Sequence, residues 1–207
     1  DVCSSDLDLV ELLNTEYSFY LQEDWDNSGF QIGNYEDEVG GILLALDLTV
    51  DSINYAIQNN INCILTHHPL FFEKIQNLQV NSDLYKKLEL LMQNNVNVIS
   101  IHTPLDIHPN GVNKFLADKC FLSNKEVFID YKEGYGYGII GSIENDTFKN
   151  YLAKLKNSFK FPMLYYGNTD NIISKIAVLG GSGAFSIKNA ISKKADLSVG
   201  RSEERRV

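Results

Sequence analysis

Short apolar runs alternate with amphipathic stretches along the first half of the chain. Residues 42–46, 61–65 and 96–101 are apolar runs bounded by polar or turn residues, which is typical of buried strands. Residues 8–21 and 84–92 instead repeat apolar positions at helical spacing. Strands that alternate with helices in this way predict an α/β fold in which a helix connects each strand to a neighbouring parallel strand.

Residues 176–200 repeat the pattern of residues 42–66. In this alignment Ile176 falls on Ile42, and strand, helix and strand follow in the same order in both copies. An internal duplication of one strand-helix-strand unit explains this similarity. We therefore predict an α/β fold of two similar lobes.

The boundaries that we assign to these lobes depend on how the two ends of the chain are interpreted. Residues 1–7 (DVCSSDL) and 201–207 (RSEERRV) match translations of sequencing-adapter sequences, so we expect both to be non-native. We place the first lobe at residues 8–130 and the start of the second at residues 131–200. Gly200 falls opposite Thr66 in the repeat, so we expect the second lobe to be truncated at its C-terminal end.

Two adjacent histidines follow the apolar run at residues 61–65. His67 and His68 stand at the end of this predicted strand, just before Pro69, where both side chains can turn toward one point. A solvated or capped loop pair is the simpler interpretation. The next strand end favours a metal site, because His102 and Asp106 follow residues 96–101 in the same manner.

Imidazole and carboxylate ligands together suit a borderline divalent metal such as Zn, Mn, Fe, Co or Ni. In open α/β sheets, ligands gather beyond the carboxyl ends of the strands. Asp47 follows a third strand end, where it either supports a ligand histidine or begins a helix. His108, the fourth histidine, is interpreted as a loop residue.

Two other segments allow a structural and a functional interpretation. Trp25, with turn residues after it, indicates a turn pinned by a buried aromatic side chain, although Asp26 and Asn27 could instead reach the site. The glycine-rich segment 180–183 either bends the chain between a strand and a helix or binds an anion through its backbone amides.

Composition excludes several classes of protein. The formal net charge of −9 and the lack of a long basic run argue against nucleic acid as a partner. No apolar run approaches the roughly 20 residues that a membrane helix needs. Outside the two ends only Cys63 and Cys120 remain, too few for a disulfide scaffold. These features predict a soluble, cytoplasmic protein.

The motifs together resemble the Nif-three-like family, whose members are also named GTP cyclohydrolase I type 2 homologues. The resemblance is carried by WDNSGFQIG, LALDLT, ILTHHPLFF, SIHTPLD with GVNKFLADK, and VLGGSG, in family order. It implies two similar α/β lobes and a toroidal homohexamer with dinuclear metal centres inside the ring.

The resemblance also implies roles for individual residues. His67, His68 and Asp106 would be metal ligands, with Asp106 placed to bridge two divalent ions, and His102 would support the ligands from behind. The remaining His and Glu ligands of the family lie in a C-terminal motif that is absent here, so the implied site is incomplete. No residue can be assigned as the general base.

The implied function is a metal-dependent hydrolase similar to GTP cyclohydrolase I type 2, in which two divalent ions activate water. The expected substrate is a small anionic molecule, with GTP as the first candidate. Two alternatives stay open: a hydrolase that acts on a different anionic substrate, and a non-catalytic metal-binding ring that serves as a scaffold or adaptor for protein partners.

Overall fold

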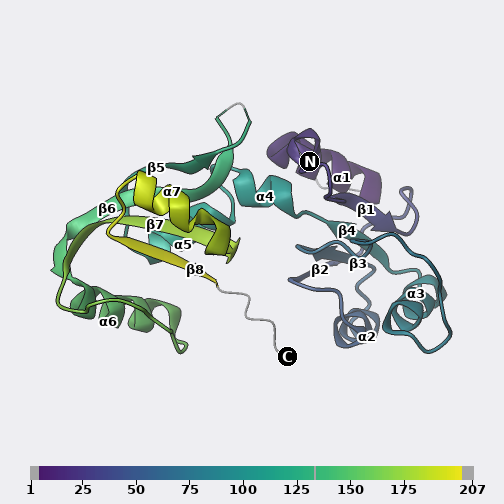
Figure 1. Ribbon diagram of the computed structural model, residues 1–207. Helices are drawn as coiled ribbons and strands as arrows, with labels where there is room; N and C mark the ends of the chain where they lie inside the picture. The colour runs from purple at the N-terminus through teal and green to yellow at the C-terminus, as the bar shows by residue number, and fades with distance from the viewer. Residues whose placement is uncertain (1–4, 133, 202–207) are drawn as a thin grey trace. The chain divides into compact units, whose positions relative to one another are not determined.

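The computed structural model describes residues 5–132 and 134–201 (Figure 1). The chain divides into two compact units, Asp1–Leu105 and Asp106–Val207. Each unit contains a four-stranded sheet with helices on both of its faces. The predicted fold of two similar α/β lobes is confirmed. No helix among the described residues is both long and apolar enough to span a bilayer.

The first unit has three parallel strands and one antiparallel strand. In chain order its elements are α1 (Asp6–Tyr17), the 3-10 helix η1 (Phe19–Leu21), β1 (Gly29–Ile32), β2 (Ile42–Ala45), α2 (Val50–Gln58), β3 (Cys63–Thr66), α3 (Asp83–Gln93) and β4 (Asn97–Ser100). The strands lie in the order β1-β4-β3-β2, with β2, β3 and β4 parallel and β1 antiparallel to β4. Helix α4 (Thr103–Ile107) follows β4 and crosses the boundary between the units.

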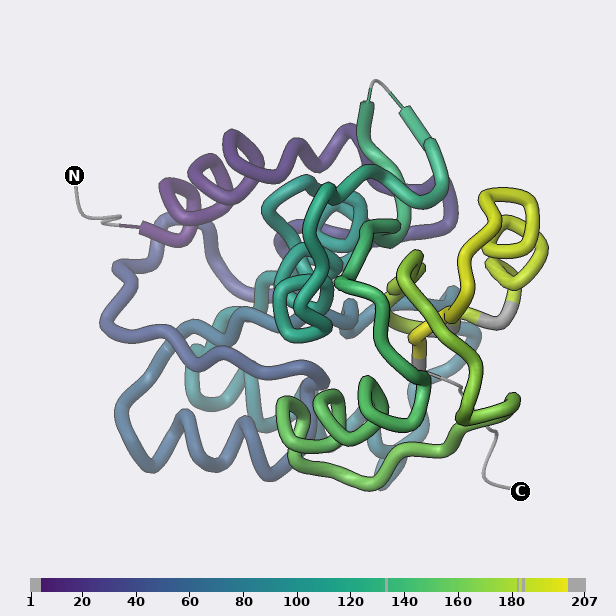
Figure 2. Tube along the Cα trace, turned by 90° about the vertical axis from the view of Figure 1, so that its left-hand side faces the viewer, coloured from purple at the N-terminus to yellow at the C-terminus, as the bar shows by residue number. Residues whose placement is uncertain are grey.

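The central strands β3 and β4 are mostly apolar because both faces of the sheet are covered. Figures 1 and 2 show α1 on one side of the sheet and the pair α2 and α3 on the other. Successive strand residues point to opposite faces. Cys63 therefore packs in the cluster with Leu9 of α1, and Ile64 packs in the cluster with Ile53 of α2. A strand buried on both faces produces the continuous apolar run seen in the sequence.

The second unit contains a mixed sheet. Its elements are α5 (Val112–Lys119), β5 (Ser123–Asp130), β6 (Gly136–Thr147), α6 (Phe148–Phe159), β7 (Ile172–Ser182), the 3-10 helix η2 (Gly183–Ser186), α7 (Ile187–Ser192) and β8 (Leu197–Arg201). The strands lie in the order β5-β6-β7-β8, and β7 and β8 form its one parallel pair. Helices α5 and α6 share one core cluster, and α7 packs in another on the opposite face (Figure 1).

Strand register supports the internal duplication residue by residue. Ile42 lies opposite Cys63 in the β2–β3 pair, and Ile176 lies opposite Leu197 in the β7–β8 pair. Residues 42 and 63 become 176 and 197 when the same offset, 134, is added to both numbers. The two parallel pairs therefore have the same register, as expected of copies of one unit.

Helix α5 belongs to the second unit, which therefore begins earlier than the sequence boundary at residues 130 and 131. Ala117 of α5 and Cys120 just after it are fully buried against Tyr151 of α6. The Tyr151 hydroxyl donates a hydrogen bond of 2.8 Å to the carbonyl oxygen of Cys120. These contacts anchor the segment to the second sheet.

The glycine-rich segment 180–183 continues a strand into a turn. Gly181 has φ of +73°, a conformation that favours glycine. The Gly180 amide already donates 2.8 Å to the side-chain oxygen of Asn113. Helix α7 begins only at Ile187, after η2, and has six residues. These features fit the turn interpretation of this segment.

Asp6 lies within a predicted non-native end, yet its side chain is fully buried in the first unit. Its Oδ2 accepts a short hydrogen bond from Asn97 Nδ2, while Oδ1 has no hydrogen-bond partner among the described residues. Burial raises the pKa of Asp6 above its ordinary value, although the bond from Asn97 opposes this shift. The carboxylate therefore destabilises the folded protein.

We expect Asp6→Asn to raise the free energy of unfolding by about 1 kcal/mol at pH 7. An amide keeps the oxygen that Asn97 contacts and removes the buried charge. Because the folded pKa is raised, the wild-type penalty appears as the pH rises above 3.8 and vanishes in more acidic solution. Urea unfolding at pH 7 and pH 3 measures this gain, with Glu11→Gln on the exposed side of α1 as the charge-matched control. An equal gain at both pH values would contradict the prediction.

Candidate metal centre

Three parallel strands of the first unit end beside one another and carry the polar residues of the site. Asp47 follows β2, His67 and His68 follow β3, and His102 follows β4. Because β3 lies between β2 and β4 in the sheet, these residues project from one edge. The position matches the ligand-binding edge that the sequence pattern predicted.

Backbone hydrogen bonds continue past the strand ends and fix this edge. The His67 and His68 amides donate to the carbonyl oxygens of Ala45 (3.1 Å) and Leu46 (3.0 Å) at the end of β2. Between β3 and β4, the hydroxyls of Thr66 and Ser100 lie 2.7 Å apart and are both buried. The two histidines therefore extend from a rigid sheet edge.

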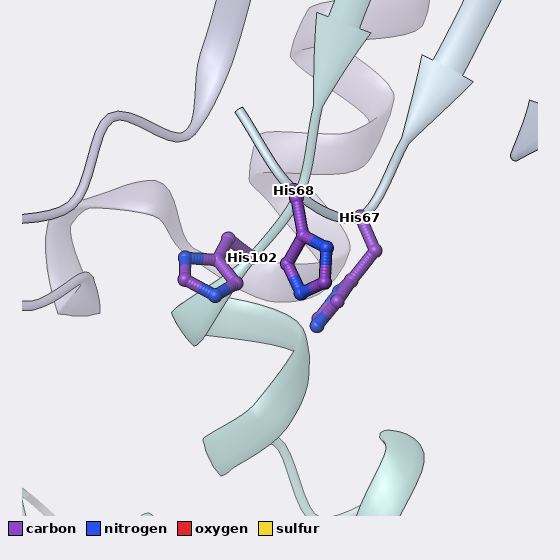
Figure 3. Close-up of side chains that lie close together, drawn as sticks. All are labelled: His67, His68 and His102. Atoms are coloured by element: carbon purple, nitrogen blue, oxygen red, sulfur yellow. The ribbon is translucent and has the colours of Figure 1, made fainter. Parts of the chain in front are cut away.

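The imidazoles of His67, His68 and His102 form one cluster (Figure 3). One ring nitrogen from each residue lies within 4.8 Å of those of the other two. The ring centroids are 4.9 Å apart for His67 and His68, 5.0 Å for His67 and His102, and 5.4 Å for His68 and His102. Three imidazoles at this spacing can hold a single divalent ion.

Each ring of the cluster makes a hydrogen bond to an oxygen through Nδ1. The acceptors are the carbonyl oxygen of Ile101 for His67 (3.0 Å), Asp47 Oδ1 for His68 (2.6 Å) and Asp26 Oδ1 for His102 (2.9 Å). A carbonyl oxygen or a carboxylate can only accept, so Nδ1 carries the proton. In the neutral rings the lone pair is then on Nε2, which is the usual arrangement of a metal-ligating histidine.

The Asp26 side chain is 0% exposed, whereas the Asp47 side chain is 59% exposed. Besides the His102 ring, Asp26 accepts hydrogen bonds from the amides of Asn27 and Thr103 and from the hydroxyls of Ser28 and Thr103. Burial raises the pKa of Asp26, but the hydrogen bonds from His102 and Thr103 outweigh it and lower the pKa to about 2. Asp26 is therefore a carboxylate that orients His102.

His67 is kept neutral by its surroundings. Burial, together with the neighbouring rings of His102 and His68, lowers the pKa of His67 to about 4. An uncharged imidazole at neutral pH has a lone pair for a cation, whereas a protonated one would repel it.

The structure distinguishes the two interpretations of the segment around Trp25. Trp25 is 56% exposed, so the prediction that a buried tryptophan pins this turn was wrong. The Asp26 side chain is fully buried instead, and it reaches the site through its hydrogen bond with His102. Asp47 likewise supports His68, while Thr49 caps α2 through a hydrogen bond with Ser52. Two features of the sequence pointed to these supporting carboxylates: Asp26 lies in the WDN segment, and Asp47 follows a strand end.

The remaining predicted ligand, Asp106, lies in α4, the helix that begins directly after His102. Its backbone carbonyl accepts a 2.8 Å hydrogen bond from Asn113 Nδ2. The predicted ligand role of its carboxylate stays a prediction. His102, which was predicted to stand behind the ligands, has a ring nitrogen in the same cluster as those of His67 and His68.

Comparison with known proteins gives a consistent result. The family model described as Duf34/NIF3 (NGG1p interacting factor 3) matches residues 7–200. A Staphylococcus epidermidis protein named GTP cyclohydrolase 1 type 2 homolog is 40% identical over 151 residues, a match that covers 73% of this chain and 40% of that protein. A Clostridium acetobutylicum protein of the same name is 33% identical over 197 residues, with 93% of this chain and 74% of that protein covered. The chain thus matches less than half the length of the first relative.

Solved structures with the same fold include the Staphylococcus aureus protein SA1388 and reduced HcgD from Methanocaldococcus jannaschii. SA1388 has a TM-score of 0.87 at 28% identity, and the match covers 97% of this chain and 80% of that one. HcgD has a TM-score of 0.81 at 30% identity, with 97% and 79% covered.

Proposed function

Because the chain belongs to the Duf34/NIF3 family, we propose that it is part of a metal-dependent hydrolase that acts on a small anionic substrate, with GTP as the first substrate to test. One observation carries the proposal: three imidazoles gather at adjacent strand ends, each with Nδ1 bonded to an oxygen acceptor. The names of the two relatives, GTP cyclohydrolase 1 type 2 homolog, support a cyclohydrolase reaction.

The donor set fits a borderline divalent cation. Neutral imidazoles suit Zn, Fe, Co and Ni, and oxygen ligands extend the choice to Mn. We propose that His67, His68 and His102 would contribute nitrogen ligands and that Asp106 would contribute a carboxylate ligand. With further ligands, such a site would hold two ions.

A bound divalent cation supplies Lewis-acid chemistry, which makes water more acidic and offsets negative charge as the substrate is attacked. The acceptors that bond to the three histidine rings orient these rings for a cation. Asp47, Asp26 and the carbonyl oxygen of Ile101 hold the three rings in the coordinating tautomer.

Charge also favours a cation at this site. The formal net charge of −9 repels an anionic substrate at long range. A bound cation would attract such a substrate electrostatically at the site itself. By the family resemblance we further propose a toroidal homohexamer that operates in the cytoplasm.

The activity test uses the 207-residue chain beside a chimera in which the C-terminal part of the Clostridium acetobutylicum relative follows Gly200. Both proteins are loaded with Zn, Mn or Fe, and formate release is measured after GTP is added. We expect turnover in the chimera and its loss in the chimera that carries His68→Ala. A fully metallated chimera without turnover would rule out GTP. Partner binding that survives metal removal would then favour the adaptor alternative.

A further inference from the structure

Two aromatic rings pack against the edge of the histidine cluster. The centroids of Trp25 and Phe72 are 5.7 Å apart, and each lies 5.8 Å from the centroid of His102. All three pairs meet edge to face, at interplanar angles of 62° to 71°. A ligand held by the histidines would therefore lie next to His102, which itself contacts Trp25 and Phe72.

Both aromatic side chains are open to solvent although their neighbour is not. Trp25 is 56% and Phe72 is 52% exposed, whereas the His102 side chain is 12% exposed. Single exposed aromatic residues are common on protein surfaces. Trp25 and Phe72 differ from such residues because they contact each other and the histidine cluster. They therefore form a continuous aromatic surface beside the candidate metal centre.

The loops that carry the two rings are joined by hydrogen bonds. Asn27 Nδ2 donates 2.9 Å to the carbonyl oxygen of Phe71, and the Phe71 amide donates 3.3 Å to Gln31 Oε1. Gln31 Nε2 closes the set with a 2.7 Å bond to the carbonyl oxygen of Asn27. The backbone segments that carry Trp25 and Phe72 are therefore joined to each other, which reduces the backbone entropy lost when a ligand binds.

We propose that Trp25 and Phe72 form a stacking subsite for the planar heteroaromatic ring of a ligand whose other end faces His67, His68 and His102. Aromatic side chains stack on nucleobase-like rings through their π-faces, and two rings set edge to face allow a third to stack on one while it meets the edge of the other. This subsite extends the proposed function, because it selects the substrate that would reach the metal centre.

The chain provides its own probe, since Trp25 is its only tryptophan. Its fluorescence is titrated with GTP, ATP and pterin as ring-bearing probes and with tripolyphosphate as a ringless anion, in protein freed of metal by chelation. We expect saturable quenching by at least one ring-bearing probe and none by tripolyphosphate. Phe72→Ala should weaken binding of that probe about tenfold, which corresponds to the loss of one stacked ring.

Two control variants test whether stacking is the cause. Phe72→Tyr keeps the ring and should bind within about twofold of wild type, because either ring can stack. Phe115→Ala removes an exposed aromatic ring from the second unit and should have no effect. Quenching by tripolyphosphate alone, or equal affinity in Phe72→Ala, would overturn the proposal.

Other outcomes separate this proposal from the proposed function. The absorption spectrum of bound Co²⁺ should be the same in Phe72→Ala and wild type, because neither aromatic ring is a ligand. Ring binding in a protein whose metal-loaded chimera releases no formate from GTP would leave the subsite in place and remove GTP as the substrate of the proposed hydrolase. If no ring-bearing probe quenches Trp25 and Phe72→Ala lowers the sedimentation coefficient, the aromatic pair is a contact between copies of the chain and the stacking proposal fails.

Discussion

His68→Ala is expected to weaken the binding of Co²⁺ and Zn²⁺ by more than about 100-fold, because removal of a supporting residue alone typically costs 10- to 100-fold. The variant removes one of three clustered imidazoles and leaves Asp47 without the ring that it holds. Co²⁺ titration followed by visible absorption, together with competition against a chelator, measures the change.

The fourth histidine provides a matched control. His108 lies outside the cluster; its Nδ1 accepts a 3.1 Å hydrogen bond from the Asn110 amide, and its ring lies 6.0 Å from that of Tyr135. His108→Ala should bind metal like the wild type. Because the His68 side chain is 40% exposed, its removal should leave thermal unfolding of the metal-free protein nearly unchanged. Equal affinity in His68→Ala and His108→Ala would show that the cluster does not bind the ion.

Much of this site could be predicted from sequence because strand ends are local features. The runs before His67 and before His102 are apolar on both faces of the sheet, so the points where they stop mark the strand ends. The duplicated unit was equally visible, since its alternation of strand and helix depends on short-range patterns. Both features follow from residues that are neighbours in the chain.

Pairings across long distances in the chain could not be predicted. Asp26 and His102 are separated by 76 positions, and no local pattern links a carboxylate to a particular ring. The strand β5 was also missed, because it lies at a sheet edge and most of its residues are exposed and polar. An edge strand of this kind lacks the apolar run that marks a buried strand.

Asp26→Asn is expected to lower the free energy of unfolding by about 3 kcal/mol and to weaken metal binding by about 10- to 100-fold. Every group that faces this carboxylate is a hydrogen-bond donor: the His102 ring, two backbone amides and two hydroxyls. The amide nitrogen of asparagine would therefore meet a donor in either orientation. Urea unfolding and Co²⁺ titration measure the two losses.

The change in metal affinity should come from the tautomer of His102. If the asparagine nitrogen points at the ring, His102 has to accept through Nδ1, and its proton moves to Nε2, the atom required for coordination. Nitrogen-15 NMR of the histidine rings distinguishes the two tautomers, and a purely structural defect would not change that signal. Asp24→Asn, which removes the same charge from an exposed neighbour, should change neither stability nor tautomer. An Asp26→Asn protein that keeps the wild-type tautomer while losing metal affinity would mean that Asp26 acts through packing or charge rather than by orienting the ring.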